Sequence, residues 1–413
     1  MKVQAVKKRT IPRSDSSRQH RVMYLENGLG FGGAVISLRT FLQHASTDRF
    51  VPLLVHSLDE TRFQSFDTLG KRLCISPLVF GNGALGFLAH RTNIDVFQYA
   101  WRLRKVILEN SIDLVYLNND IFSNLAGIIA AKLAGVPAIL HERGIPHARS
   151  GLAQVVAKWP DRYLAISGAV RTAILRYGVR AESIRMVPEG LDLALYEPLD
   201  QVKLLEVRRS LGIENPDVPL VVMAGMVMPW KGQHVLLAAA KKVLQRNPHT
   251  RFVIVGEAPS GAEGYEKELH GMLYGHSIEN ALSFAGYRSD IPAIMQAADV
   301  VVHASTLPEP FGRVVIEGMV MGAVVIATNI GAPPEIIEDG VSGFLVPPSD
   351  PSALSARILE TLEDDSMRER IGRRARKIVI EKYGIARHVE LIEAVFEEVL
   401  DSSDDDAGKR RES

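Results

Sequence analysis

Short runs of consecutive apolar residues alternate along the chain with longer segments in which apolar residues return every three or four positions. The short runs predict buried β-strands, and the longer segments predict helices. The predicted strands are residues 21–26, 51–56, 114–117, 138–141, 163–166 and 184–187, followed by 220–224, 251–255, 282–285, 299–303, 324–327 and 343–346. Strands that alternate with helices form parallel sheets covered on both faces, so we expect an α/β fold.

The pattern is interrupted at residues 200–219, which contain a charged helix followed by Gly212-Ile213-Glu214-Asn215-Pro216-Asp217-Val218-Pro219. Such a composition is typical of a hinge between domains. The chain has 413 residues, which is too long for one ordinary core. We therefore predict an N-terminal domain over residues 21–205 and a C-terminal domain over residues 206–380.

Residues 303–317 combine a strand end, a turn and a helix start. The apolar run ends at His303, the prolines that follow turn the chain, and helical spacing begins near Gly312. The first amides of such a helix are unpaired and suit an anion. Glu309 lies in the turn, and Glu317 lies about five residues into the helix, roughly 7–8 Å along its axis. Two carboxylates at different depths suit a nucleotide sugar, with Glu317 placed to accept hydrogen bonds from a ribose.

Three features of this region together resemble the donor-site signature of glycosyltransferase family 4. They are the sequence Glu-Pro-Phe-Gly at 309–312, the seven residues between the two glutamates, and Gly331-Ala332-Pro333-Pro334-Glu335 downstream. The resemblance implies a GT-B fold, in which two Rossmann-like, doubly wound domains face each other across a cleft. It also implies a retaining transferase that binds a nucleotide sugar in the C-terminal domain and a glycan, a lipid-linked sugar or a small molecule in the N-terminal domain. The last helix of the family crosses back to the N-terminal domain, and residues 381–400 are the expected equivalent.

The same resemblance assigns roles to individual residues. Glu309 is expected to contact the hydroxyls of the donor sugar, Glu317 the ribose and Lys231 the diphosphate. His141 directly follows a predicted strand and resembles a family histidine near the donor sugar and phosphate, so the expected catalytic set is Glu309, His141 and Lys231. The residues expected to bind the donor are Gly32, Gly33, Gly225, Lys231, Phe311, Gly312, Val314, Val315 and Glu317.

Two positions depart from the family pattern. Met226 stands where the family usually has an arginine that contacts the diphosphate together with the lysine, and Glu189 stands where asparagine is usual. Arg288, Arg313 and His234 are the candidates to supply the missing positive charge.

Four other functions compete with a transferase. The spacing of Gly28, Gly30 and Gly33 matches a dinucleotide fingerprint, but the second strand ends in His56-Ser57 without the acidic residue that a dehydrogenase needs. A glycoside hydrolase needs two carboxyl groups that face each other across a bond, which two glutamates on one loop and helix do poorly. Sugar-nucleotide 2-epimerases share the architecture but lack this glutamate spacing. A non-catalytic nucleotide-sugar-binding or scaffold subunit keeps the fold and could lose groups such as the missing arginine.

Composition and charge narrow the partners. The 48 Lys and Arg residues equal the 48 Asp and Glu residues, so charge gives no argument for nucleic acid. No Asp-x-Asp stands at a predicted strand end, and we expect neither a metal nor a cofactor. The single Cys74 excludes an intramolecular disulfide and fits a reducing compartment.

The two ends of the chain are highly charged. Residues 1–21 contain seven basic side chains and one acidic side chain without the apolar core of a secretory signal, so residues 1–20 are predicted to be a disordered arm. The alternative is a weak contact of this arm with anionic lipid, which corresponds to a cytoplasmic protein peripheral to the inner membrane face. Residues 401–413 are also predicted to be disordered. Residues 125–140 imitate a membrane span, but Gly135-Val136-Pro137 indicates a buried helix that is followed by a strand.

Overall fold

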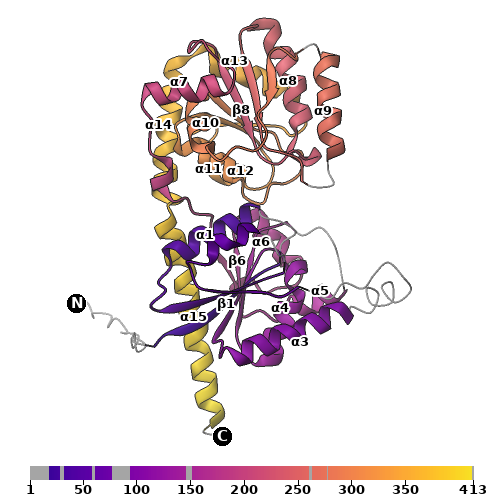
Figure 1. Cartoon of the computed structure of the whole chain (residues 1–413), viewed down its shortest axis with the longest axis vertical. Helices are drawn as coiled ribbons and strands as arrows, with labels where there is room; N and C mark the ends of the chain where they lie inside the picture. The colour runs from indigo at the N-terminus through magenta and orange to yellow at the C-terminus, as the bar shows by residue number, and fades with distance from the viewer. Residues whose placement is uncertain are drawn as a thin grey trace, which may run out of the picture.

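The computed structural model describes residues 18–27, 32–57, 61–76, 94–145, 151–259, 263–276 and 278–411. Gly28, Gly30 and residues 1–17 of the predicted arm lie outside these ranges. Figure 1 shows two lobes, one above the other, and the last two helices of the chain, which follow one another from the upper lobe down along the lower one. Each lobe contains one parallel sheet covered by helices, so the α/β fold with two doubly wound domains is confirmed.

The N-terminal sheet has seven strands in the order β3-β2-β1-β4-β5-β6-β7, all parallel. The strands are β1 (His20–Glu26), β2 (Phe50–His56), β3 (Lys71–Cys74), β4 (Leu114–Asn118), β5 (Ala138–Glu142), β6 (Arg162–Ala165) and β7 (Ile184–Met186). The helices are α1 (Gly33–His44), η1 (Thr61–Phe66), α3 (Ile94–Glu109), α4 (Ile121–Ala134), α5 (Gly151–Val156), α6 (Gly168–Leu175), η2 (Ala181–Ser183) and η3 (Leu193–Tyr196).

The C-terminal sheet has six strands in the order β10-β9-β8-β11-β12-β13, also all parallel. The strands are β8 (Leu220–Ala224), β9 (Arg251–Val255), β10 (Leu282–Phe284), β11 (Val300–His303), β12 (Val324–Thr328) and β13 (Phe344–Val346). The helices are α7 (Gln201–Ser210), η4 (Pro229–Lys231), α8 (Gln233–Arg246), α9 (Glu263–His276), α10 (Ile291–Ala297), α11 (Arg313–Val320), α12 (Pro333–Ile336), α13 (Pro351–Glu363), α14 (Asp365–Lys382) and α15 (Ile385–Arg411).

Each sheet has one point at which the strand order reverses. In the N-terminal sheet it lies between β1 and β4, and in the C-terminal sheet between β8 and β11. The loops that follow these four strands diverge to opposite faces of the sheet and leave a crevice at its carboxyl edge, where ligands of open α/β sheets bind. The site must therefore be sought after Glu26, Asn118, Ala224 and His303.

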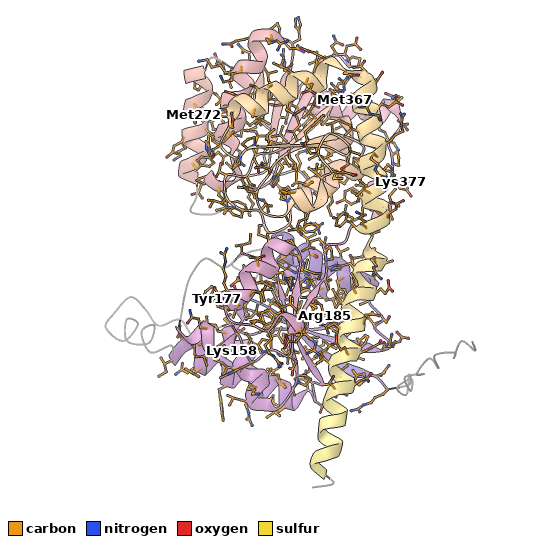
Figure 2. All side chains as sticks on the ribbon, turned by 180° about the vertical axis from the view of Figure 1, so that it is seen from behind. Lys158, Tyr177, Arg185, Met272, Met367 and Lys377 are labelled. Carbon is orange, nitrogen blue, oxygen red and sulfur yellow. The ribbon has the colours of Figure 1, made fainter. Side chains whose placement is uncertain are left out.

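The last helix packs on the N-terminal sheet. Ile392 and Phe396 of α15 belong to the same buried apolar cluster as Tyr24, Phe41 and Tyr116 of the N-terminal domain. Figures 1 and 2 show the helix, in yellow, running along the N-terminal lobe, and in Figure 2 Arg185 lies beside it. The guanidinium of this arginine donates to Glu398 of α15 at 2.6 Å.

The charged tail differs from the prediction. Residues 401–411 continue α15, whereas their composition predicts disorder from residue 401. A helix that is already nucleated and packed gains one backbone hydrogen bond for each residue added, without a second nucleation cost. The buried part of α15 therefore extends helix into a segment that could not form one alone.

The segment that imitates a membrane span is a helix followed by a strand. α4 ends at Gly135, whose φ of +71° closes the helix, and β5 follows three residues later. Within the described ranges, no helix combines the length and the apolar character needed to cross a membrane.

Candidate active site between the two domains

Lys231 and Glu309 form a buried ion pair at the carboxyl edge of the C-terminal sheet. They follow the neighbouring strands β8 and β11, which is why the fold brings them together. Nζ of Lys231 donates to Oε2 of Glu309 at 2.8 Å, and Oγ of Ser305 and Nε2 of His303 lie 3.0 and 2.9 Å from the same oxygen. Burial alone raises the pKa of Glu309, but Lys231 and His303 outweigh it and hold the pKa below its ordinary value. Glu309 is therefore an ionised carboxylate.

Two glycines set the shape of this cluster. Gly232 has a φ of +82°, and a side chain there would clash with the carbonyl oxygen of Ala304. Gly331 has a φ of +77°, and a side chain there would clash with the backbone of Glu309. The Glu309 carbonyl also accepts from the amide of Ala332 at 2.9 Å. The segment that begins at Gly331 thus supports the Glu309 turn from outside.

The turn after β11 enters α11 through Gly312, whose φ is +91°. Phe311 and Val315 are buried, so their side chains serve packing. The amides of Arg313 and Val314 have no hydrogen-bond partner among the described residues. The start of α11 therefore offers two backbone donors to an anion.

Glu317 lies one turn further along α11, next to the segment that joins the domains. Its Oε1 accepts from the hydroxyl of Tyr196 at 3.2 Å and from Nη2 of Arg313 at 3.3 Å. The side chain is 13% exposed, and it reaches a cavity of about 850 Å³. A carboxylate at the wall of a cavity of this size can accept hydrogen bonds from a bound ligand.

The cavity lies between the two domains. Its lining comes from α1, from the interdomain segment and from the start of α10, and includes Ile36, Arg39, Thr40, Gln43, Leu195, Ser289, Asp290 and Ile291. Arg313 and Glu317 line it as well, whereas Glu309 and Lys231 do not. The two glutamates therefore face different spaces along the same helix start.

A network of buried polar side chains occupies the facing edge of the N-terminal sheet. Arg143, which follows β5, forms an ion pair with Glu189 and donates to Oγ of Ser37 at 2.9 Å and to Oδ1 of Asn118 at 2.7 Å. Burial raises the pKa of Glu189, but Arg143 and then Arg313 outweigh it and lower the pKa to about 2. The residue that departs from the family pattern is thus the ionised centre of this network.

His141 belongs to the interior of the N-terminal domain. It is fully buried, and its Nδ1 bonds the hydroxyl of Tyr116 and lies 3.2 Å from Nη2 of Arg143. Its ring lies 5.9 Å from that of His388 in α15. Burial lowers the pKa of His141 well below its ordinary value, and Arg143 adds to this, so the imidazole is neutral. The described contacts of His141 do not join it to the cluster of Lys231 and Glu309.

Arg313 connects the two domains. Its Nη1 lies 3.6 Å from Oε2 of Glu189 and its Nη2 lies 3.3 Å from Oε1 of Glu317. The side chain of Arg313 also passes the start of α1, because a Cβ added to Gly33 would lie 3.6 Å from its Cδ atom. Gly32 directly precedes this helix. Burial lowers the pKa of Arg313, but the two glutamates outweigh it and raise the pKa above its ordinary value.

Two further contacts hold α6 of the N-terminal domain against the C-terminal domain. Oγ of Ser167 donates to the carbonyl of Pro310 at 2.6 Å. The carboxylate of Glu335 accepts from the amides of Gly168 at 2.8 Å and Ala169 at 3.0 Å. A carboxylate on the first amides of a helix is favourable because those amides lack partners within the helix. The structure therefore shows the two domains in contact around the candidate site.

The three residues that could supply the positive charge missing at Met226 have different surroundings in the structure. Gly225 follows β8 with a φ of +142°, and Met226 after it is 47% exposed and uncharged. Arg288 is engaged by an aspartate two residues on, at 2.6 Å, and Nδ1 of His234 bonds a tyrosine hydroxyl at 2.8 Å. Of the three, Arg313 is the one that begins α11 and passes Gly33 at the start of α1. Sequence reasoning missed Arg143, and it left Glu189 without a role.

Comparison with known proteins agrees with the geometry. Residues 207–378 match the family model described as "Glycosyl transferases group 1", and residues 31–195 match "Glycosyltransferase Family 4". The chain belongs to this family of glycosyltransferases. The first match contains all six strands of the C-terminal sheet, and the second contains β2 to β7 of the N-terminal sheet.

Curated relatives match part of the length of the chain. It is 29% identical over 237 residues to spore coat protein SA of Bacillus subtilis, covering 55% of this chain and 62% of the relative. It is 29% identical over 202 residues to D-inositol 3-phosphate glycosyltransferase of Corynebacterium efficiens, covering 48% of this chain and 47% of the relative. The alignments thus span about half to two thirds of these relatives.

A solved structure matches nearly the whole chain. The crystal structure of Anabaena HepE in complex with UDP and glucose has a TM-score of 0.79 and 28% identity, and the match covers 92% of this chain and 100% of that one. The fold is therefore GT-B, as the resemblance of residues 309–335 implies.

Proposed function

We propose that the protein transfers a sugar from a nucleoside-diphosphate sugar to an acceptor with retention of the anomeric configuration. The observation that carries the proposal is the arrangement around the start of α11. Lys231 and Glu309 lie on one side of two unpaired amides, and Glu317 lies beyond them at the cavity. This arrangement follows the order of a nucleotide sugar: sugar, diphosphate and ribose.

In this proposal the ribose bonds Glu317, and the base occupies the cavity beside Ser289 and Asp290. The diphosphate lies between the amides of Arg313 and Val314 and the glycines at the start of α1. The sugar extends toward Glu309. HepE is described in complex with UDP and glucose, which favours a UDP-sugar as the donor of this chain as well.

Arg313 takes the place of the arginine that Met226 replaces. Its guanidinium lies beside the proposed diphosphate position, and Glu189 already has a closer partner in Arg143. Binding of the diphosphate exchanges the contact with Glu317 for phosphate oxygens, which leaves Glu317 available to the ribose. A planar guanidinium suits two phosphate oxygens at once.

The chemistry then depends on stabilising the leaving group. When the bond between the anomeric carbon and the phosphate oxygen breaks, negative charge grows on the diphosphate, and fixed donors aimed at it lower the barrier. Lys231, Arg313 and the amides of α11 are such donors, and their charges supply what a divalent metal would otherwise provide. Glu309 holds Lys231 in place and accepts from a sugar hydroxyl.

Retention follows if the acceptor hydroxyl attacks from the face that the diphosphate leaves, without a protein nucleophile, and passes its proton to the departing phosphate oxygen. The engagement of Glu309 Oε2 by three donors supports this route, because those contacts lower the nucleophilicity of the carboxylate. His141 acts as a positioning residue that supports Arg143 from behind. The acceptor, a glycan, a lipid-linked sugar or a small molecule, enters along the N-terminal domain.

Nucleotide release from a panel of UDP-, GDP- and ADP-sugars tests the proposal, with and without EDTA. Release from one donor that persists in EDTA and falls at least about 100-fold in Glu317→Ala and Lys231→Ala is the expected result. Lys242→Ala on the exposed side of α8 is the matched control and should behave like wild type. Absence of binding to every nucleotide sugar would refute the proposal.

A non-catalytic nucleotide-sugar-binding subunit is the second candidate. The observation that favours it is Met226, which leaves the end of β8 without the charge that the family has there. Tight binding of one nucleotide sugar without release, even with sugar acceptors added, would select this function. Release that depends on Lys231 would exclude it.

A further inference from the structure

Helix α3 is apolar on two opposite faces. Its inner face packs Leu103, Val106 and Ile107 into the core of the N-terminal domain. Its outer face carries four large apolar side chains that are between 45% and 63% exposed: Ile94, Phe97, Trp101 and Leu108. Their spacing of three, four and seven residues aligns them along one side over about 21 Å. A surface helix of a soluble domain normally has charged or polar residues on this side.

Basic side chains border this α3 outer face. Arg104 lies over the ring of Trp101 at 5.1 Å and donates through Nε to the carbonyl of Leu133 at 3.1 Å, which joins the face to an exposed leucine of α4. Arg21 and Lys71 both bond Asn110 at the end of the helix. The basic residues of α3, of the segments bonded to its end and of α4 beside Leu133 are Arg18, Arg21, Lys71, Arg102, Arg104, Lys105 and Lys132. The carboxylates on these segments are Asp95, Glu109 and Asp113, of which Glu109 pairs with Lys105 and Asp113 with Arg18.

We propose that the α3 outer face, together with Leu133, binds an anionic lipid surface. Exposed tryptophan, phenylalanine and leucine side chains enter the headgroup region, and the lysines and arginines beside them pair with lipid phosphates. The positive charge beside the α3 outer face favours an anionic lipid surface over a second copy of the chain. A second copy of the chain would bring the same excess of positive charge against itself, whereas an anionic bilayer complements it.

The position of the face fits this partner. Figure 1 shows α3 on the side of the N-terminal lobe that faces away from the C-terminal domain. A protein that rests on a bilayer through this side keeps the cleft between the domains in water. The proposal stands on the surface alone and does not depend on which reaction the cleft performs.

Flotation of the full chain with lipid vesicles tests the proposal. Vesicles that contain phosphatidylglycerol should bind the protein, and vesicles of phosphatidylcholine alone should bind it much more weakly. The double variant Phe97→Ser, Trp101→Ser should partition at least about tenfold less, because two apolar anchors are removed. Arg104→Glu with Lys105→Glu should also reduce binding and should lower its sensitivity to salt.

Tyr274→Ser is the control, since Tyr274 is an aromatic residue on α9 of the other domain and is even more exposed than Phe97 and Trp101. It should bind vesicles like wild type, and all variants should keep the thermal midpoint of wild type. Equal binding of the Phe97→Ser, Trp101→Ser variant would overturn the proposal, as would binding that is lost only when residues 1–17 are removed. A dimer in solution that the variant dissociates, without vesicle binding, would assign the face to a second copy instead.

Discussion

Nη1 of Arg313 lies 3.6 Å from Oε2 of Glu189, and the two residues belong to different domains. Glu189 is already neutralised by Arg143, and Nη1 of Arg313 makes no hydrogen bond to the described residues. Arg313, whose side chain is 20% exposed, pairs with Glu317 through Nη2, so only its Nη1 lacks a hydrogen-bond acceptor among the described residues. A bound diphosphate would supply that acceptor.

This relationship predicts a rescue experiment. Arg313→Gln should lower the rate of nucleotide release about 100-fold, because one donor to the leaving group is lost. Adding Met226→Arg to this variant should raise the rate of nucleotide release at least about tenfold above that of Arg313→Gln alone, because it returns a guanidinium to the end of β8. Arg246→Gln is the control, since Arg246 is an exposed arginine of the same domain that pairs with Glu363 and should be silent. A wild-type rate of nucleotide release by Arg313→Gln would show that Arg313 does not replace the arginine for which Met226 stands.

The pair of Glu189 and Arg143 predicts a pH-dependent stability. The pKa of Glu189 falls from 4.5 to about 2 on folding, which corresponds to about 3 kcal/mol at neutral pH. Because the folded pKa is the lower one, this stability is present above about pH 4.5 and is lost as the pH falls toward 2. Glu189→Gln should cost about 3–5 kcal/mol at pH 7, since Arg143 is left buried without its partner.

Thermal unfolding at pH 7, 5, 4 and 3 measures this effect. The gap between wild type and Glu189→Gln should be widest at pH 7 and should narrow as the pH falls. Glu182→Gln changes an exposed glutamate of the same domain and should track wild type at every pH. A gap that stays constant with pH would mean that Glu189 is not ionised in the folded protein.

Most strands of both sheets could be predicted from the sequence, because strands buried on both faces have continuous runs of apolar residues. The edge strand β3 could not be predicted, because it is short, begins with Lys71 and Arg72, and has no such run. The same two-sided burial hides the direction of His141, since an apolar strand does not reveal which face each side chain takes. The contact of Arg313 with Glu189 joins two domains, and no local pattern encodes it.

A side chain at Gly232 should destabilise the protein by a steric clash, and the same substitution at Gly322 measures the cost of the backbone conformation alone. Gly232 and Gly322 both have a φ of +82°, but only at Gly232 would a side chain clash, with the carbonyl of Ala304. Gly322→Ala should cost about 1–2 kcal/mol for its backbone conformation. Gly232→Ala should cost several kcal/mol more and should displace Lys231, which lowers nucleotide release. Equal thermal midpoints of the two variants would contradict the clash.

The carboxylate of Glu335 predicts how firmly the domains hold together. Glu335→Ala removes two charge-assisted hydrogen bonds to the start of α6, which together contribute about 1 kcal/mol because they are exposed to solvent. The variant should populate a more open form, with a larger radius of gyration in small-angle X-ray scattering and a higher KM for the donor. Glu338→Ala, which changes an exposed neighbour, should scatter like wild type. An unchanged radius and KM would show that other contacts are sufficient.

The packing of α15 has a consequence for the order of synthesis. Tyr24, Phe41 and Tyr116 are covered by Phe396, which the ribosome adds more than 270 residues after the last of them. While the C-terminal domain is being made, the N-terminal sheet therefore presents an uncovered aromatic surface. The first domain to emerge is the last to be completed, and a truncation before α15 should leave a nascent sheet that aggregates or recruits chaperones.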